Sequence, residues 1–147
     1  MRVVLDTNVF IIGFIDLAEN VPSPETIILR DFFQKEKTVV MSAALEEQIL
    51  RVVLRVKDKD FAGLVRHMLW SDFRIDFVDT AQQPRIAKTF AAKIPRTDLD
   101  IFLAAFIGAA DCLVSNDGEF IASAARCQNR FACMNPAEFV KQNVKKM

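Results

Sequence analysis

Short apolar runs alternate with longer amphipathic stretches along the whole chain. Four or five consecutive residues that are mainly apolar are typical of buried strands, and hydrophobic residues that recur every three or four positions are typical of helices. The predicted strands cover residues 2–6, 37–41, 75–78, 112–115 and 131–134. The predicted helices cover about residues 9–18, 23–34, 42–56, 60–71, 83–93, 97–109, 120–125 and the stretch that begins at 135.

Helix-start signals sharpen several of these boundaries. Ser23 and Asn135 each precede a proline, which suits the first helical position because that position has no need of an N–H. Ser42 can cap the helix that follows it, and Thr97 or Asp98 can cap another.

Strands that alternate with helices from end to end predict an α/β protein, with helices on both faces of a central, mostly parallel sheet. We therefore expect a three-layer α/β/α sandwich. The chain of 147 residues has the size of one ordinary domain and shows no repeat or linker, so residues 1–147 are predicted to form a single domain.

Composition narrows the class of protein. Apolar residues make up 52% of the chain and charged residues 26%, which is typical of a soluble globular protein. No apolar run approaches the roughly 18 residues of a membrane span, and Asp6 stands where a signal peptide would need its apolar region. We expect a cytoplasmic location, with the three cysteines as free thiols because their number is odd and no C-x-x-C spacing occurs.

The formal net charge is zero, so any contact with nucleic acid must depend on local groups of basic residues. Two such groups occur, and each is also explained by a solvated helix face. The first comprises Arg51, Arg55, Lys57, Lys59 and Arg66. The second comprises Arg85, Lys88, Lys93 and Arg96, with no acid among them.

Several acids follow predicted strands. Asp6 ends the first strand, Asp117 follows the fourth, and Glu46 or Glu47 lies in the first turns of the helix after the second. The carboxyl ends of parallel strands meet at one sheet edge, and Asp98 begins a further helix. Each acid alone is explained by a cap or a turn, but carboxylates that converge repel one another unless a cation lies between them. Oxygen ligands without Cys or His point to Mg²⁺ or Mn²⁺.

Geometry removes two other acids from this cluster. Asp111 precedes the strand that Asp117 follows, so the two are roughly 17–20 Å apart. Asp100 is two residues beyond Asp98 on a helix, about 200° around its axis, so only one of them can face the metal. We choose Asp98, because Phe102 lies on its side of the helix.

The fourth ligand position has three candidates. On a helical wheel Glu46 falls inside the apolar arc, Glu47 falls at its edge, and Gln48 flanks the stripe formed by Leu45 and Val52. Glu46 is the carboxylate that we include among the metal ligands, with Glu47 and Gln48 as the alternatives.

Three motifs in this order resemble the PIN-domain family, whose members include the VapC-type toxins of bacterial toxin–antitoxin pairs. The first is the strand Val-Val-Leu followed by Asp6-Thr7-Asn8. The second is Asp98-x-Asp-Ile-Phe-Leu-Ala-Ala, followed by Gly108-Ala-Ala-Asp-Cys-Leu-Val-Ser115-Asn116-Asp117. The third is the closing corner Asn135-Pro-Ala-Glu-Phe.

The resemblance covers nearly the whole chain and implies a metal-dependent endoribonuclease with catalytic, metal-binding acids at Asp6, Asp98 and Asp117. It also implies an RNA substrate and suggests an antitoxin partner and a homodimer. Family members usually carry a Glu where this chain has Gln48. The neighbouring polar residues suit hydrogen bonds to the carboxylates or to bound water, although caps and turns explain them equally well. These residues are Thr7, Asn8, Ser115 and Asn116.

Other functions are compatible with parts of the sequence. A non-catalytic PIN-like module that binds RNA or protein would account for Gln48 and for the neutral net charge. A phosphatase of the haloacid-dehalogenase type would need a second Asp where Asn8 stands. His67 and Trp70, one turn apart among apolar residues, are interpreted as packing residues, and the single His excludes an acid–base triad.

Overall fold

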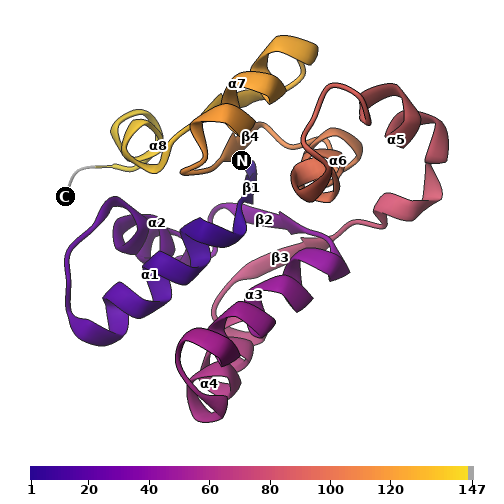
Figure 1. Cartoon of the computed structure of the whole chain (residues 1–147). Helices are drawn as coiled ribbons and strands as arrows, with labels where there is room; N and C mark the ends of the chain where they lie inside the picture. Colours follow the sequence, from indigo (N-terminus) through magenta and orange to yellow (C-terminus); the bar gives the residue numbers. More distant parts are fainter. Residues whose placement is uncertain (146–147) are drawn as a thin grey trace.

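The computed structural model describes residues 1–145 and contains a five-stranded sheet in the order β3-β2-β1-β4-β5 (Figure 1). All four strand pairings are parallel, as the alternation of strands and helices predicts. The strands are β1 Arg2–Leu5, β2 Thr38–Met41, β3 Arg74–Phe77, β4 Cys112–Val114 and β5 Ala132–Met134.

Helices connect the strands and cover both faces of the sheet (Figure 1). They are α1 Thr7–Glu19, α2 Pro24–Phe33, α3 Ala43–Val56, α4 Lys59–Ser71, α5 Pro84–Phe90, α6 Leu99–Ile107, α7 Gly118–Cys127 and α8 Pro136–Asn143. The chain steps from β1 to β2 to β3 and then crosses back to β4, so right-handed connections place α1–α4 and α5–α7 on opposite faces. The predicted α/β sandwich is confirmed.

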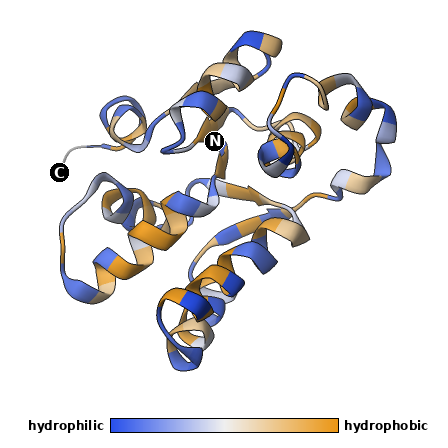
Figure 2. Cartoon of the chain, in the orientation of Figure 1, coloured by the Kyte–Doolittle hydropathy of each residue, from blue (hydrophilic) through white to orange (hydrophobic). Residues whose placement is uncertain are grey.

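The core lies between the sheet and the two helix layers. Residues 3–5 of the central strand β1 are fully buried, because helices cover both of its faces. Figure 2 shows hydrophobic and hydrophilic residues alternating along α3, which buries Leu45, Ile49 and Val53. Nine of the thirteen Phe side chains are buried in this core, and the three cysteines are free thiols. No helix within residues 1–145 is long and apolar enough to cross a membrane.

Polar residues lie directly after four of the five strands, at the carboxyl edge of the sheet. Asp6 follows β1, Ser42 follows β2, Ser115 follows β4 and Asn135 follows β5. Asp6 and Ser42 are also the N-caps of α1 and α3, so the chain turns from strand to helix at these residues. Helix α1 therefore begins two residues earlier than predicted.

The start of α6 differs from the sequence-based expectation. Residues Arg96–Asp98 form a 3₁₀ turn that leads into the helix, and the Asp98 side chain makes no capping hydrogen bond. Asp98 is the N-cap residue of α6, so one of the two predicted cap positions is confirmed, but the side-chain hydrogen bond expected of a cap is not formed. The consequence is that the Asp98 carboxylate is not engaged by the backbone of its own helix.

The interpretation of His67 and Trp70 as packing residues is also wrong. Helix α4 buries only Val65 and Leu69 fully, and both His67 and Trp70 are exposed. A helix that packs on one side turns its other positions toward solvent, and residues two positions apart differ by about 200°. The Trp70 side chain is 62% exposed and contacts the Phe77 ring on the edge strand β3.

Candidate active site

A pocket of about 390 Å³ lies at the carboxyl edge of the sheet, and three carboxylates line it. Asp6 and Asp117 belong to segments that follow the neighbouring strands β1 and β4, and Asp98 precedes α6. The remaining lining side chains are Thr7, Asn8, Gln48 and Thr97, with Ile11, Ile12, Val52 and Ile101 as the apolar wall. We call this hollow the acid pocket.

Asp6 is the most buried of the three acids, with 5% of its surface exposed. The Ser115 hydroxyl donates to its Oδ2 at 2.6 Å, and the Thr7 backbone N–H donates to its Oδ1 at 2.7 Å. Burial raises the pKa of Asp6, and these two hydrogen bonds oppose that rise, while the charge of Asp117 adds to it. The carboxylate is therefore fixed in orientation but costly to ionise.

Asp117 caps helix α7, because its Oδ1 accepts the N–H groups of Glu119 and Phe120 at 3.1 and 3.2 Å. Its own N–H donates to the Ser115 Oγ at 3.0 Å, so one serine hydroxyl contacts both Asp6 and Asp117. The Asp117 carboxylate therefore caps α7 and lines the acid pocket at the same time.

Asn8 contacts three members of this hydrogen-bond network. Its Nδ2 lies 3.4 Å from both the Asp6 Oδ2 and the Ser115 Oγ, and its Oδ1 accepts the Asn116 N–H at 3.2 Å. Ser115 and Asn8 thus contact the Asp6 carboxylate, whereas Asn116 hydrogen-bonds Asn8 and not an acid. Thr7 contributes its backbone N–H, whereas its buried Oγ1 has no hydrogen-bond partner among residues 1–145.

Asp98 differs from the other two acids because its carboxylate has no hydrogen-bond or ion-pair partner within the described part of the chain. Its pKa is raised from 3.8 to about 6, first by burial and then by the negative charges of Asp6 and Asp117. The Asp98 carboxylate is thus destabilised by the two other acids that line the same pocket.

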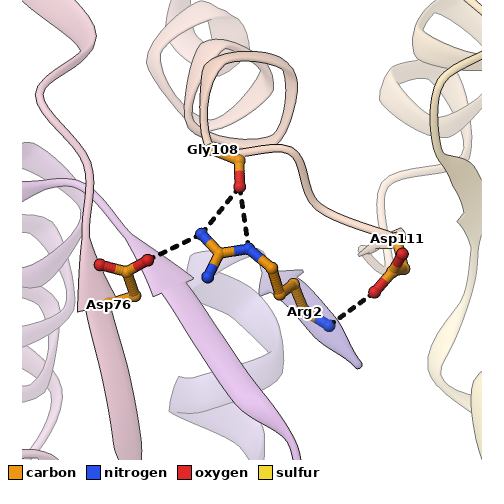
Figure 3. Close-up of polar contacts among 4 residues, drawn as sticks. All are labelled: Arg2, Asp76, Gly108 and Asp111. Carbon is orange, nitrogen blue, oxygen red and sulfur yellow. Dashed lines mark hydrogen bonds and ion pairs between the residues drawn. The ribbon is translucent and has the colours of Figure 1, made fainter.

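The two excluded acids lie elsewhere. Asp100 accepts the Ser42 hydroxyl at 2.5 Å and the Thr80 hydroxyl at 2.6 Å, and it does not line the acid pocket. Asp111 lies at the amino end of β4, where its Oδ2 accepts the Arg2 N–H at 2.8 Å (Figure 3). Neither acid lines the acid pocket, so neither is included in the proposed ligand set.

Of the three candidates for the fourth ligand, only Gln48 lines the acid pocket. Glu47 instead lines a groove between α3 and α4. Glu46 lines neither hollow, and one of its carboxylate oxygens is buried without a hydrogen-bond partner among the described residues. Glu46 faces the packed side of the helix, as its position inside the apolar arc implied, so we remove it from the proposed ligand set.

The donor set suits a hard cation. Every polar group in the pocket offers oxygen or amide atoms, and no Lys, Arg or His is among its described lining residues. The Thr7 hydroxyl has no hydrogen-bond partner within residues 1–145. No three acidic, His or Cys side chains within residues 1–145 are already close enough to enclose an ion. Binding would therefore require the carboxylates to close inward, with Asp98 the least restrained of them.

The basic residues are distributed over two surfaces. Arg51, Lys59 and Arg66 line the α3–α4 groove of about 470 Å³, whereas Lys57 pairs with Glu19 at 2.9 Å. The other group runs along α5 into the 3₁₀ turn Arg96–Asp98, and all four of its cations are exposed. Arg96 is thus two residues from the pocket acid Asp98.

Sequence reasoning missed the network around Asp100. Ser42 was predicted only as a helix cap, and Thr80 received no role, yet their hydroxyls join α3 and the turn after β3 to the start of α6. The available signal was their location, because both residues follow strands of the same parallel sheet. A hydroxyl there lies at the edge where the acids also meet.

Two solved structures are similar to this chain over almost its whole length. One is VapBC2 from Rickettsia felis, bound to a DNA fragment from their promoter, with a TM-score of 0.62, 18% sequence identity, and coverage of 92% of this chain and 98% of that chain. Another is FitAcB from Neisseria gonorrhoeae, with a TM-score of 0.53, 20% identity and the same coverage. Both are toxin–antitoxin complexes whose toxins are PIN domains. This chain has the PIN-domain fold.

No protein-family model matches the sequence, and no curated protein matches it either. The similarity to the two PIN-domain structures, at 18% and 20% identity, concerns the fold. The function of this particular PIN fold has to be argued from its acid pocket.

Proposed function

We propose that this PIN-fold protein is a metal-dependent endoribonuclease that hydrolyses phosphodiester bonds in RNA. The observation that carries the proposal is the convergence of Asp6, Asp98 and Asp117 on one pocket that has no cationic side chain among its described lining residues. Such an arrangement is unfavourable for the protein alone and favourable once a divalent cation is present.

Asp6, Asp98 and Asp117 are the residues that would hold Mg²⁺ or Mn²⁺, and they are the proposed catalytic residues. A divalent ion lowers the pKa of water and offsets negative charge on a phosphate, which are the two requirements of phosphodiester hydrolysis at neutral pH. Ser115 and the Thr7 N–H hold the Asp6 carboxylate in a fixed orientation. Asn8 and Asn116 restrain the loop that carries Asp117.

The substrate proposal depends on the exposed cations. Arg85, Lys88, Lys93 and Arg96 are exposed and have no ion-pair partner within residues 1–145, so they can contact phosphates on a strand that reaches the acid pocket. Cleavage should therefore weaken as salt concentration rises.

The fold supports a biological role as the toxin of a toxin–antitoxin pair, acting in the cytoplasm. The two similar structures are complexes of a PIN-domain toxin with its antitoxin. An antitoxin protein is accordingly the proposed partner, and a second copy of the chain is another. The toxin role can be tested by examining the neighbouring genes. We expect an adjacent open reading frame that encodes a small DNA-binding protein.

The activity is tested by cleavage of single-stranded RNA with Mn²⁺ and with excess EDTA. We expect cleavage only with the metal, and a loss of at least ~100-fold in Asp6→Asn and Asp98→Asn, because even indirect supports of a metal site contribute ~10–100-fold. Asp60→Asn is the matched control, since Asp60 is exposed in the first turn of α4. Equal cleavage by the wild type and both pocket variants would contradict the assignment.

A specific observation favours a second function. Gln48 lines the acid pocket where family members usually carry an acid, so the pocket has one negative charge fewer. A non-catalytic module that binds RNA or protein with a degraded metal site would account for this.

The two functions differ in their response to metal and to Gln48→Glu. The nuclease should show a thermal shift at millimolar Mn²⁺, and the added carboxylate should increase its metal affinity. A folded wild type that shows neither a thermal shift nor cleavage, while Gln48→Glu gains both, identifies a degraded site.

A further inference from the structure

A second pocket, of about 530 Å³, lies at the same edge of the sheet as the acid pocket. Its walls come from the first turn of α3, the end of β3 and the 3₁₀ turn Thr80–Gln82. The lining side chains include Phe77, Asp79, Thr80 and Ser42. We call it the aromatic pocket because of Phe77.

The two pockets are connected through the first turn of α6. Asp100 accepts hydrogen bonds from Ser42 and Thr80, which both line the aromatic pocket, and Asp98 in the acid pocket is two residues earlier. Residues two positions apart point to opposite sides of a helix, whose diameter with side chains is about 10 Å. The pockets therefore lie on opposite sides of one helix end.

Phe77, which lines the aromatic pocket, contacts a second exposed ring, that of Trp70. Phe77 is 42% exposed and Trp70 is 62% exposed, and their ring centroids are 5.6 Å apart at an interplanar angle of 30°. Nine other Phe side chains are buried, so this pair is an exception in a chain that otherwise buries its rings. Large exposed rings are typical of surfaces where flat ligands stack.

The polar groups of the pocket suit a base better than a phosphate. No Lys, Arg or His is among its described lining residues. Asp79 uses one oxygen to accept the Ala81 N–H at 2.9 Å, and its other oxygen has no partner within residues 1–145. A carboxylate accepts well from the exocyclic amino group of a base such as cytosine.

We propose that the aromatic pocket binds one unpaired nucleobase of a single-stranded RNA whose phosphate lies in the acid pocket. The base stacks on the Phe77 ring, next to the contact of that ring with Trp70, and Asp79 favours bases with an amino group over uracil. The inference rests on the proposed ribonuclease function and adds a specificity site to it.

The sequence provides a direct optical test, because Trp70 is the only Trp and the chain has no Tyr. We titrate the metal-free protein in EDTA with short oligoadenylate, oligocytidylate and oligouridylate while measuring Trp fluorescence. Saturable quenching is expected, with tighter binding of the two amino-bearing oligomers, because base stacking alters the environment of the indole ring.

Three variants localise the effect. Phe77→Ala should weaken binding about 5- to 150-fold, which corresponds to the usual contribution of one stacked base. Asp79→Asn should remove the preference over oligouridylate with little loss of overall affinity. Leu64→Ala is the matched control, since Leu64 is 52% exposed on the same helix as Trp70, and it should bind like the wild type.

The outcomes separate this inference from the proposed function. Metal-dependent cleavage without any Trp response, or with unchanged binding in Phe77→Ala, overturns the base site and leaves the ribonuclease intact. Quenching that is sensitive to Phe77 but occurs without cleavage supports the base site and counts against the nuclease. A Trp signal that follows protein concentration and not RNA overturns the inference, because a second copy of the chain then covers the rings.

Discussion

Carboxylates gather at both ends of the sheet, but only one of the two groups has a cationic partner. At the amino end, the Arg2 guanidinium contacts Asp76 at 2.8 Å and donates to the Gly108 carbonyl at 3.0 and 2.8 Å (Figure 3). The Arg2 backbone N–H also donates to Asp111 at 2.8 Å. At the carboxyl end, the acid pocket contains three carboxylates and no cationic side chain among its described lining residues.

The presence or absence of a cationic partner separates acids that stabilise the folded state from acids that destabilise it. The amino-end group joins the starts of β1 and β4 to β3, with Asp76 ion-paired to the Arg2 guanidinium and Asp111 hydrogen-bonded to the Arg2 backbone N–H. In the acid pocket, burial and repulsion raise the pKa of Asp6 and of Asp98, so ionising them opposes folding. Proteins keep such unfavourable groups chiefly where function requires them.

The largest expected effect, on cleavage, comes from removing the hydrogen bonds of Asp100 that hold the helix start next to Asp98. Asp100→Ala removes the acceptor of the Ser42 and Thr80 hydroxyls, so the start of α6 is no longer held against α3. We expect a ~10–100-fold loss of Mn²⁺-dependent cleavage, the range for groups that orient ligands from behind. Cleavage rates and melting temperatures are measured together, and Asp100→Asn, which keeps an acceptor oxygen, should restore part of the activity. Full activity in Asp100→Ala would show that the contact does not position Asp98.

The next effect concerns stability and pH. An acid whose pKa rises from 3.8 to about 6 on folding favours the folded state below its ordinary pKa, and this benefit is lost as pH rises through about 6. In EDTA at about pH 7.5, Asp98→Asn should therefore be more stable than the wild type. The upper bound is ~3 kcal/mol, and partial exposure of the side chain reduces it to ~1–2 kcal/mol.

Urea denaturation at two pH values checks this. The advantage of Asp98→Asn over the wild type should shrink as pH is lowered to about 5, where the wild-type carboxyl becomes protonated in the folded protein. If Asp98→Asn is less stable than the wild type at about pH 7.5, Asp98 stabilises the fold, and the proposed contrast between destabilising acids at the carboxyl end and stabilising acids at the amino end is wrong.

The smallest effect has the opposite sign and lies at the amino end. Asp111→Ala removes the acceptor of the Arg2 N–H, so we expect a loss of ~1 kcal/mol, the usual value for a partly exposed hydrogen bond. Cleavage should be unchanged, because Asp111 lies at the far end of β4 from Asp117. A gain in stability would mean that Asp111, like Asp98, destabilises the folded state.

The sequence was sufficient to predict the fold because its signals agree. Apolar strands, capped helices and their strict alternation all predict a parallel sheet, and the strand that precedes Asp6 is the central, fully buried one. The acids at its carboxyl edge followed from the same topology. The choice of Asp98 over Asp100 followed from helix periodicity.

Other features depended on details that periodicity does not encode. The 3₁₀ turn before α6 releases the Asp98 side chain from capping, and no local pattern distinguishes such a turn from a regular helix start. Trp70 is exposed because α4 packs on α3 with its other side and lies at the periphery of the fold, where the Trp70 ring contacts only Phe77 among the aromatic rings of residues 1–145; such exposure is a tertiary property. The fourth position was undecided among three neighbours, since a helical wheel gives faces and not distances to other segments.

Calorimetric titration of the RNA-free protein with Mn²⁺ tests the central claim most directly, namely that the acids of the acid pocket hold a divalent cation. Wild type and Asp111→Asn should bind Mn²⁺ with the same affinity, whereas Asp6→Asn and Asp98→Asn should bind it at least ~10-fold more weakly. Equal binding by all four proteins, or no binding by the folded wild type, would contradict the account.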